Sequence, residues 1–273
     1  MIVLLRLLLF IGRVSPFARR LLWRRWYNRL ASRYGVQSWT FMNYGYAPAD
    51  ETDPLVLGPA DEPDRFCIQL YHYTISAAEL AGKRVLEVGA GRGGGASFLA
   101  RHHQPESMIA VDFSPKAVAL CQKRHAVPNL EFKVGDAEQL PFEDSTFDAV
   151  VNVESSHCYG HIDRFFSEAT RVLEPGGWFL YTDFRETEEW PEVENQLTAT
   201  AGLTLIESED ITDRVLAALA ADDDRKRAMI AEVIPENARP LFEEFAGVAT
   251  GRIFEQFTER TMIYKRFALQ RTA

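Results

Sequence analysis

A glycine-rich turn carries the strongest signal for ligand binding in this sequence. Residues 85–95 read VLEVGAGRGGG, so an apolar run reaches Glu87 and glycines follow at Gly89, Gly91 and Gly93. Glycines at this spacing after a strand let the backbone approach a ligand closely, and Gly89–Gly94 also match the G-x-G-x-x-G pattern of dinucleotide-binding proteins. The turn alone does not distinguish a dinucleotide from another nucleoside-containing ligand.

Two carboxylates follow at positions suited to a nucleoside. Asp112 ends the next apolar run, 23 residues after Gly89, where an acid can bind both ribose hydroxyls. Dinucleotide enzymes place an acid there as well. Asp136, within Gly135-Asp136-Ala137, ends the third apolar run and can accept a hydrogen bond from an adenine amino group.

A scaffold that gathers strand ends is needed to position these residues. Ser114 and Pro115 are typical of a helix start. The alternation of strands with helices of 10–15 residues predicts a doubly wound parallel sheet, with the ligand at the carboxyl ends of the strands. The expected strands are RVLEVG, MIAVDF, LEFKVGD, FDAVVNVES and GGWFLYTDF, and the expected helices are GGASFLARHH, SPKAVALCQKRH and HIDRFFSEATRVL.

The ordered series of motifs resembles the class I S-adenosylmethionine (AdoMet) methyltransferases over about 85–185. The glycine turn, Asp112, GDA, LPFEDSTFDAVVNVES and RVLEPGGWFLYTDF occur in the order and spacing of that family. DEPDRFCIQLYHYTISAAELAGKRVLEVGAGRGGGASFLAR and VVNVESSHCYGHIDRFFSEATRVLEPGGWFLYTDFR look more narrowly like phthiotriolone-type lipid O-methyltransferases, over about 20–185. A more distant similarity is to methyltransferases of tocopherols, sterols, quinones and glycosylated natural products.

The resemblance implies an α/β fold with a seven-stranded, mostly parallel, Rossmann-like sheet. AdoMet is then the cofactor, with S-adenosylhomocysteine as its product. Glu87 is expected at the ammonium group, although capping of the next helix is an alternative role for it. The other implied contacts are Gly89 and Gly91 with the methionine part, Asp112 with the ribose, Phe113 with the adenine face, Asp136 and Ala137 with the adenine edge, and Asn152 beside the sulfonium.

The acceptor chemistry centres on His157, which follows the fourth expected strand in VESSHCYGH. A neutral imidazole can remove a hydroxyl proton near pH 7. In the natural-product O-methyltransferases that this chain resembles, a histidine at the matching place acts as base and an aspartate in ADF supports it. The corresponding TDF stretch here gives Asp183. The alternative is that His157 belongs to the substrate wall or is a hydrogen-bonded structural residue.

Two neighbours of His157 have other conceivable roles. His157 and His161 have the spacing of a zinc pair, but no further ligands with suitable spacing accompany them, so no metal is expected. Cys158 is interpreted as a buried thiol beside the pocket rather than a nucleophile.

The regions flanking the motifs complete the expected architecture. A helix is expected at about 64–80, a sixth strand in GLTLIESEDIT and a last strand in ERTMIYKRFALQ. The helical segment at about 213–250 is interrupted by Pro235 and Pro240, and in the resembled group such an insertion covers the acceptor. It is therefore interpreted as a lid, with packing on the outside of the sheet as the alternative.

The amino-terminal end is strongly basic. Residues 1–49 contain eight arginines and no Asp or Glu, so the net charge of −9 divides into +8 here and −17 elsewhere. The acidic body argues against a nucleic-acid partner. Arg6, Arg13, Arg20 and Arg24 form a narrow helical stripe beside Leu, Trp and Tyr residues, with a break expected at Ser15-Pro16. Residues 1–30 therefore either lie on an anionic membrane surface or pack as a cap on the domain.

The chain thus divides into basic amphipathic helices at 1–46, a linker rich in proline and acids at 47–64, and a methyltransferase domain at 65–273. Cys67, Cys121 and Cys158 form no disulfide pattern, which predicts a cytoplasmic location, with peripheral contact at the inner face of a membrane as the further expectation. The sequence does not indicate the oligomeric state.

Three classes of function are compatible with these residues. The leading one is AdoMet-dependent O-methylation of a hydroxyl on a lipid or polyketide-like molecule, with His157 as base. The second is C-methylation of a prenyl, sterol or quinone-like acceptor, or methylation of a fatty carboxylate. The third is an AdoMet-binding protein without transferase activity.

Overall fold

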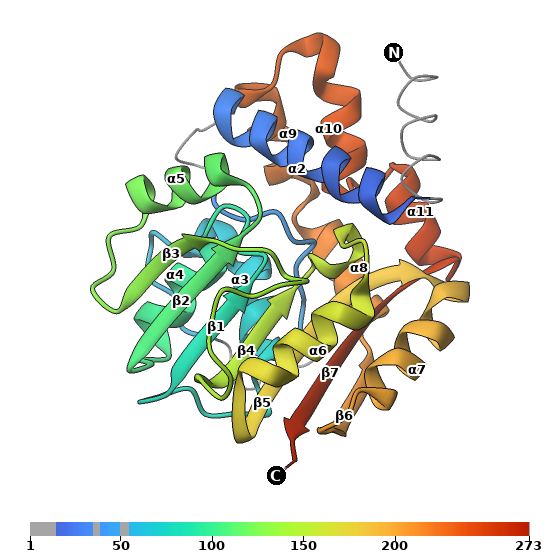
Figure 1. The fold of residues 1–273 in the computed structure, drawn as a ribbon. Helices are drawn as coiled ribbons and strands as arrows, with labels where there is room; N and C mark the ends of the chain where they lie inside the picture. The colour runs from blue at the N-terminus through green and yellow to red at the C-terminus, as the bar shows by residue number, and fades with distance from the viewer. Residues whose placement is uncertain (1–14, 35–38, 50–54, 273) are drawn as a thin grey trace.

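A single twisted sheet of seven strands forms the centre of the protein (Figure 1). The structure, a computed structural model, describes residues 15–34, 39–49 and 55–272. The strand order is β3-β2-β1-β4-β5-β7-β6, and only β7 runs antiparallel to its neighbours. The strands are β1 (Arg84–Val88), β2 (Ser107–Asp112), β3 (Leu130–Val134), β4 (Phe147–Val153), β5 (Leu173–Glu186), β6 (Leu203–Asp210) and β7 (Met262–Arg271).

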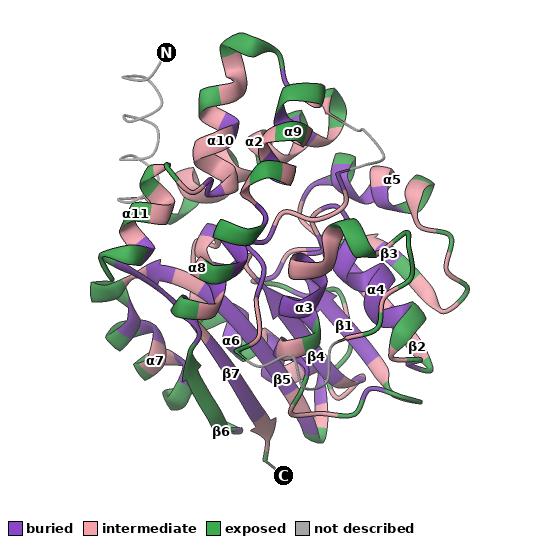
Figure 2. Cartoon of the chain, turned by 180° about the vertical axis from the view of Figure 1, so that it is seen from behind, coloured by how far each residue is buried: buried purple, intermediate pink, exposed green. Residues whose placement is uncertain are grey.

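Helices cover both faces of this sheet. One face packs against α3, α4, α5, α8 and α11, and the other against α6 and α7. Alternate residues of β1 serve the two faces, with Val85 in one core cluster and Leu86 in the other, as expected for a sheet buried on both sides. Figure 2 shows the buried residues gathered in the sheet and in the helices on its rear face. The covering helices are α3 (Arg65–Thr74), α4 (Gly94–His102), α5 (Pro115–Arg124), α6 (Ile162–Val172), α7 (Trp190–Ala199), α8 (Thr212–Ala221) and α11 (Arg252–Thr258).

A third group of helices lies at the carboxyl ends of the parallel strands. It consists of α2 (Pro16–Arg33), α9 (Asp223–Val233) and α10 (Arg239–Ala246), which lie together at the top of Figure 1. Leu30 of α2 shares a small apolar core with Trp39, Ile230 and Phe242. Helix α2 and the α9–α10 part of the insertion between β6 and β7 therefore form one cap over the sheet edge.

The expected fold is confirmed. Every strand expected from the sequence is present, and the helix after β2 begins at Pro115 with Ser114 accepting a hydrogen bond from Ala117 N at 3.0 Å. The helix expected at 64–80 ends earlier, at Thr74. No element was expected at Trp190–Ala199, which forms α7.

The amino-terminal segment is more closely integrated than a separate unit would be. A helix begins at Pro16 with Ser15 as its cap, as expected, but the helical part ends at Arg33, and Tyr44 and Tyr46 lie in the main core. Arg92 of the glycine turn donates hydrogen bonds of 2.6 Å to the carbonyls of both Tyr34 and Trp39. The expected division at residue 46 therefore cuts through one packed body. Arg6 and Arg13 lie outside the described residues.

Candidate active site

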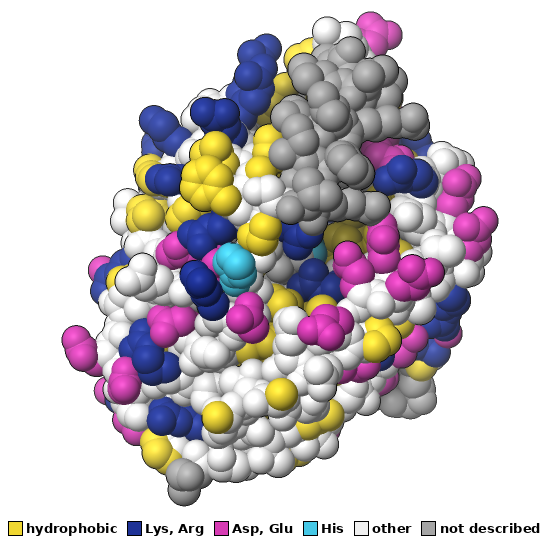
Figure 3. Space-filling model, turned by 45° about the vertical axis from the view of Figure 1, so that its right-hand side comes forward, with side chains coloured by type: hydrophobic (Ala, Val, Ile, Leu, Met, Phe, Trp, Pro, Cys, Tyr) yellow, Lys and Arg dark blue, Asp and Glu magenta, His cyan; other side chains and the backbone are white. Residues whose placement is uncertain are grey.

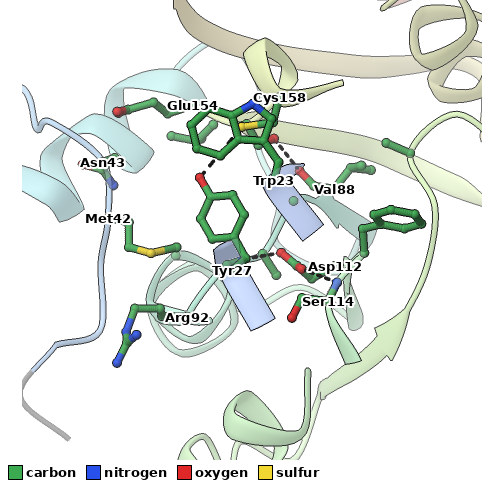
Figure 4. Close-up of a pocket in the computed structure, with 18 of the residues that line it drawn as sticks. Trp23, Tyr27, Met42, Asn43, Val88, Arg92, Asp112, Ser114, Glu154 and Cys158 are labelled. Atoms are coloured by element: carbon green, nitrogen blue, oxygen red, sulfur yellow. Dashed lines mark hydrogen bonds between the residues drawn. The ribbon is translucent and has the colours of Figure 1, made fainter. Parts of the chain in front are cut away.

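A cavity opens at the carboxyl ends of β1, β2 and β4, beneath α2 (Figure 4). The glycine turn, the ends of β2 and β3, the loop after β4, residues 40–44 and Phe245 of α10 contribute to its walls. The cavity thus lies at the edge of the sheet where the sequence predicted the ligand. Its roof comes from Arg20, Trp23, Arg24 and Tyr27 of α2.

The glycine turn forms a cradle that side chains would fill. Gly89 has a φ of +85°, and a Cβ added there would lie 2.3 Å from Ser155 Oγ. Gly91 has a φ of +54°, and its Cβ would lie 2.7 Å from Met42 Cε. Both the backbone conformation and the close approach of these two side chains therefore require glycine, whereas the close approach of a ligand stays a prediction.

Asp112 lies at the floor of the cavity. Its Oδ2 accepts a hydrogen bond from Gly91 N at 2.9 Å and its Oδ1 accepts one from Ser114 N at 2.8 Å. Burial raises the pKa of this carboxyl to about 6, although both backbone N–H groups oppose the shift. The carboxylate therefore connects the glycine turn to the start of α5.

Phe113 and the end of β3 meet α2 across the cavity. The guanidinium carbons of Arg20 and Arg24 lie 5.2 and 4.7 Å from the centre of the Phe113 ring. Arg20 also forms an ion pair with Glu138, at 2.7 Å, and another with Asp136. Asp136 and Ala137 line the cavity as expected, but the Asp136 carboxylate is already paired with the roof helix.

Glu87 and Asn152 lie behind the cavity wall rather than in it. Both are fully buried and neither lines the cavity. Glu87 accepts a hydrogen bond from Tyr71 Oη at 2.7 Å, and burial raises its pKa to about 7. Glu87 Oε2 is buried and has no hydrogen-bond partner among the described residues, so the helix-capping alternative stays a prediction. Asn152 Nδ2 donates to Val88 O at 2.8 Å and so holds β4 against the glycine turn.

His157 and Asp183 come together as expected from the sequence. His157 lies in a short turn after β4 and lines the cavity, whereas Asp183 lies in β5 and is fully buried. The Nδ1 atom of His157 is 2.9 Å from Asp183 Oδ1. Asp183 Oδ2 accepts hydrogen bonds from His157 N at 2.9 Å and from Ser156 Oγ at 2.5 Å. The carboxylate thus fixes both the ring and the backbone of His157.

The surroundings of this pair favour the charged histidine. Burial by itself lowers the pKa of His157, but Cys158 and the Asp183 carboxylate outweigh it, so the pKa lies above its ordinary value. The pKa of Asp183 is lowered: burial opposes the ionised form, but His157 and Arg185 outweigh it. Asp183 is therefore a carboxylate that accepts the Nδ1 proton, and Nε2 is the ring nitrogen left for a ligand.

Several cavity residues were not recognised as site residues from the sequence. Trp23 and Tyr27 belong to the helix expected either to lie on a membrane surface or to cap the domain, and no site role was expected for them. Both line the cavity, and the Trp23 ring lies 6.1 Å from that of His157. Glu154 was overlooked, although an acid directly after a buried strand is the same signal that identified Asp112. Cys158 is buried at the cavity wall as expected, with Tyr27 Oη 3.9 Å from its Sγ.

Comparisons with known proteins agree with this geometry. Residues 86–181 match a family model described as a methyltransferase domain. The chain is 41% identical over 257 residues to phthiotriol/phenolphthiotriol dimycocerosates methyltransferase 1 of Mycobacterium ulcerans, covering 93% of this chain and 90% of that protein. The chain belongs to this family of AdoMet-dependent methyltransferases. The family membership therefore argues against the third class of function, an AdoMet-binding protein without transferase activity.

The chain is also similar to a second relative in sequence and to a solved structure in fold. This methyltransferase is 39% identical over 264 residues to a fatty-acid O-methyltransferase of Mycolicibacterium smegmatis, covering 96% of this chain and 92% of that protein. The crystal structure of geranyl diphosphate C-methyltransferase from Streptomyces coelicolor A3(2), in complex with S-adenosyl-L-homocysteine, aligns with a TM-score of 0.64 at 16% identity, over 93% of this chain and 98% of that one. At that identity the second likeness establishes the fold alone.

The cavity of this methyltransferase fits AdoMet. The glycine turn and the Asp112 carboxylate both line the cavity, as the expected contacts with the methionine part and the ribose would require. Phe113 and Ala137 offer apolar contacts for adenine. Among the described residues, no group of three or more His, Cys, Asp or Glu side chains is arranged to hold a metal ion.

Proposed function

We propose that this methyltransferase O-methylates a hydroxyl of a lipid or polyketide-like acceptor, with His157 as general base. The observation that carries the proposal is the pairing of His157 Nδ1 with Asp183 Oδ1 at 2.9 Å on the cavity wall. A hydroxyl gives up its proton when it is methylated, and an imidazole nitrogen within reach can take it. In its neutral form His157 keeps the proton on Nδ1, toward Asp183, and Nε2 is then free to accept the hydroxyl proton.

In this reaction each residue of the site has a separate role. AdoMet, when bound, supplies an electrophilic methyl group. His157 accepts the hydroxyl proton at Nε2, and Asp183 stabilises the resulting imidazolium through Nδ1. Trp23, Phe184 and Phe245 line the cavity, so aromatic rings exclude water around the reacting atoms.

A hydrophobic acceptor suits both the cavity and the relatives. The cavity is walled largely by aromatic and aliphatic side chains, several of them from the cap formed by α2 and α10. The two curated relatives are named for phthiotriol dimycocerosates and for fatty acids. Both names describe molecules with long hydrocarbon parts, which supports a lipid acceptor here.

A fatty carboxylate is the second candidate acceptor, because one relative is named a fatty-acid O-methyltransferase. A carboxylate at neutral pH has no proton to lose, so His157 would instead bind it as an imidazolium. The raised pKa of His157 is compatible with that role as well. C-methylation of a prenyl, sterol or quinone-like acceptor would leave the His157–Asp183 pair without a hydroxyl proton to remove.

The experiment that tests the proposal uses AdoMet with a labelled methyl group and a crude lipid extract. The labelled product is isolated and its structure determined by mass spectrometry before and after mild alkaline hydrolysis. An ether formed from a hydroxyl keeps the label through hydrolysis. Release of the label as methanol would identify a carboxylate ester, and a label bound to carbon would identify C-methylation. Either result would contradict the proposed acceptor.

Peripheral membrane contact through residues 1–30 is part of the proposal. Two apolar side chains of α2, Phe17 and Leu21, are 76% and 38% exposed, and arginines lie beside them on the exposed side of the helix. Figure 3 shows basic and hydrophobic side chains next to each other on the upper part of one face. No helix in the described part of the chain is both long and apolar enough to cross a bilayer.

Replacing Phe17 and Leu21 together with serine should reduce sedimentation with vesicles that contain phosphatidylglycerol. Added salt should also reduce sedimentation of the wild-type protein, because arginines meet headgroup charge. Deleting residues 1–30 is a poorer test, since it also removes the cavity roof. The Val56→Ser variant, which changes an apolar residue 87% exposed elsewhere, is the control. Equal sedimentation of all three proteins would contradict membrane contact.

A further inference from the structure

Glu154 occupies an unusual backbone position at the cavity. It follows β4 directly and has a φ of +51°, in the left-handed region that residues with a Cβ rarely adopt. Its backbone N–H donates to Thr182 O at 2.8 Å, which ties this conformation to β5. Such strain persists where the surrounding structure enforces it, and it is concentrated at functional sites.

The side chain of Glu154 is held at one oxygen only. Oε2 accepts a hydrogen bond from Tyr44 N at 2.8 Å and another from Tyr264 Oη at 3.0 Å. These donors come from the amino-terminal segment and from the last strand, both 110 residues away in the chain. Among the described residues no hydrogen bond reaches Oε1, and Glu154 lines the cavity (Figure 4).

The protonation state of Glu154 indicates what Oε1 can do. Burial raises the pKa of Glu154 to about 8, although Tyr44 and the positive charge of His157 oppose the shift. Burial therefore favours the neutral, protonated form of this carboxyl group. Because Oε2 already accepts two hydrogen bonds, the proton belongs on Oε1, where the O–H can donate to a ligand.

The mechanism proposed above uses His157 and assigns no role to Oε1 of Glu154. A simple alcohol would present alkyl groups to this donor, and an unmatched polar group in a water-excluding site weakens binding. An acceptor with a second oxygen would match it. Sites with a buried hydrogen-bonding group discriminate strongly against ligands that lack the matching atom.

We infer that Glu154 is a specificity-determining residue that donates a hydrogen bond to a second oxygen of the acceptor, near the hydroxyl that is methylated. This inference rests on the proposed function, because it assumes a hydroxyl-bearing acceptor. It narrows the substrate class from simple long-chain alcohols to diols, hydroxy ethers and hydroxy ketones. Glu154 and His157, three residues apart in one loop, then recognise adjacent oxygens.

Calorimetric binding to the protein saturated with S-adenosylhomocysteine tests the inference. The probes are a medium-chain secondary alcohol, the 1,3-diol of the same chain length, and the diol with its second oxygen methylated. The wild-type protein should bind the diol and its methoxy analogue about tenfold more tightly than the alcohol, the scale of one hydrogen bond. Glu154→Ala should bind all three alike. Glu154→Gln should keep the preference, because its amide can accept from Tyr44 and Tyr264 and still donate into the cavity.

The control variant is Glu209→Gln, since Glu209 also accepts a hydrogen bond from a tyrosine hydroxyl, that of Tyr73, but lies outside the cavity. It should keep the wild-type preference. Equal wild-type affinities for alcohol and diol, or a preference that survives Glu154→Ala, would overturn the inference. Should Glu154→Ala fail to fold, the methoxy analogue still tests the inference on the wild-type protein. Its second oxygen can only accept a hydrogen bond, so binding much weaker than that of the diol would exclude a donor at Glu154. If the wild-type protein prefers the diol but transfers a methyl group to no hydroxyl, that result would instead contradict the proposed function.

Discussion

His157→Ala should lower turnover on the acceptor by about 10²–10⁴-fold while leaving AdoMet affinity nearly unchanged. The imidazole lines the cavity beside Asp183, but its ring is not part of the glycine cradle or the Asp112 site. Removing it therefore takes away the proton acceptor and not the cofactor contacts. Single-turnover rates and AdoMet calorimetry on the same preparation measure the two quantities separately.

Two other variants sharpen this result. Asp183→Asn should cost less than His157→Ala, because it disturbs the orientation of the ring without removing the base. His161→Ala is the matched control, since His161 precedes α6 and does not line the cavity, and it should keep wild-type turnover. Wild-type turnover in His157→Ala on the true acceptor would show that alignment alone drives transfer.

Asp112→Ala should weaken AdoMet binding by roughly 1.5–3 kcal/mol, or about ten- to 150-fold, as expected for hydrogen bonds to a charged group. The carboxylate lies at the cavity floor and also accepts from Gly91 N and Ser114 N, so both the ribose contact and the glycine turn are affected. Calorimetric titration with S-adenosylhomocysteine measures the change.

Asp144→Ala is the control for this experiment, because the Asp144 side chain is 75% exposed and lies outside the cavity. It should bind the ligand as the wild-type protein does. A thermal melting curve shows whether Asp112→Ala is folded. A folded Asp112→Ala protein with unchanged affinity would contradict the assignment of this strand end to the ribose.

The sheet and the cofactor cradle could be predicted because their signals are local. Each strand is a short apolar run bounded by a turn, and strand ends in a parallel sheet meet at one edge. From these two facts alone, Gly89, Asp112 and His157 are expected to lie together at that edge. Asp183 lies within another strand, β5, and could be identified only because the chain resembles O-methyltransferases in which an aspartate at that place supports the histidine base.

The roof of the cavity could not be predicted in this way. The contacts of Arg20 with Glu138 and Asp136 span 118 and 116 residues, and nothing in the local sequence of α2 specifies them. An amphipathic pattern predicts that one helix face is buried but not against what. The sequence therefore leaves open whether Trp23 and Tyr27 face a membrane surface or pack as a cap, and in the structure both line the cavity of their own domain.

Burial likewise decides roles that motifs leave open. The spacing of Glu87 and Asn152 suggests direct cofactor contacts, but both side chains are fully buried and neither lines the cavity: Glu87 accepts a hydrogen bond from Tyr71 and Asn152 donates one to Val88 O. For α7, Pro191 near the first turn and Glu192 were helix-start signals that could have been used. The charged composition of the segment obscured its apolar face.

The pH dependence of kcat tests the general-base account most directly. Wild-type protein and Asp183→Asn are assayed on the hydroxyl acceptor at saturating AdoMet across the acid and neutral range. A base must be neutral to accept a proton, so kcat should rise with pH through an apparent pKa above the ordinary histidine value of about 6.5. Loss of the Asp183 carboxylate should move that limb to lower pH. A kcat that is flat or falls as pH rises, with no shift in Asp183→Asn, would contradict proton removal by His157.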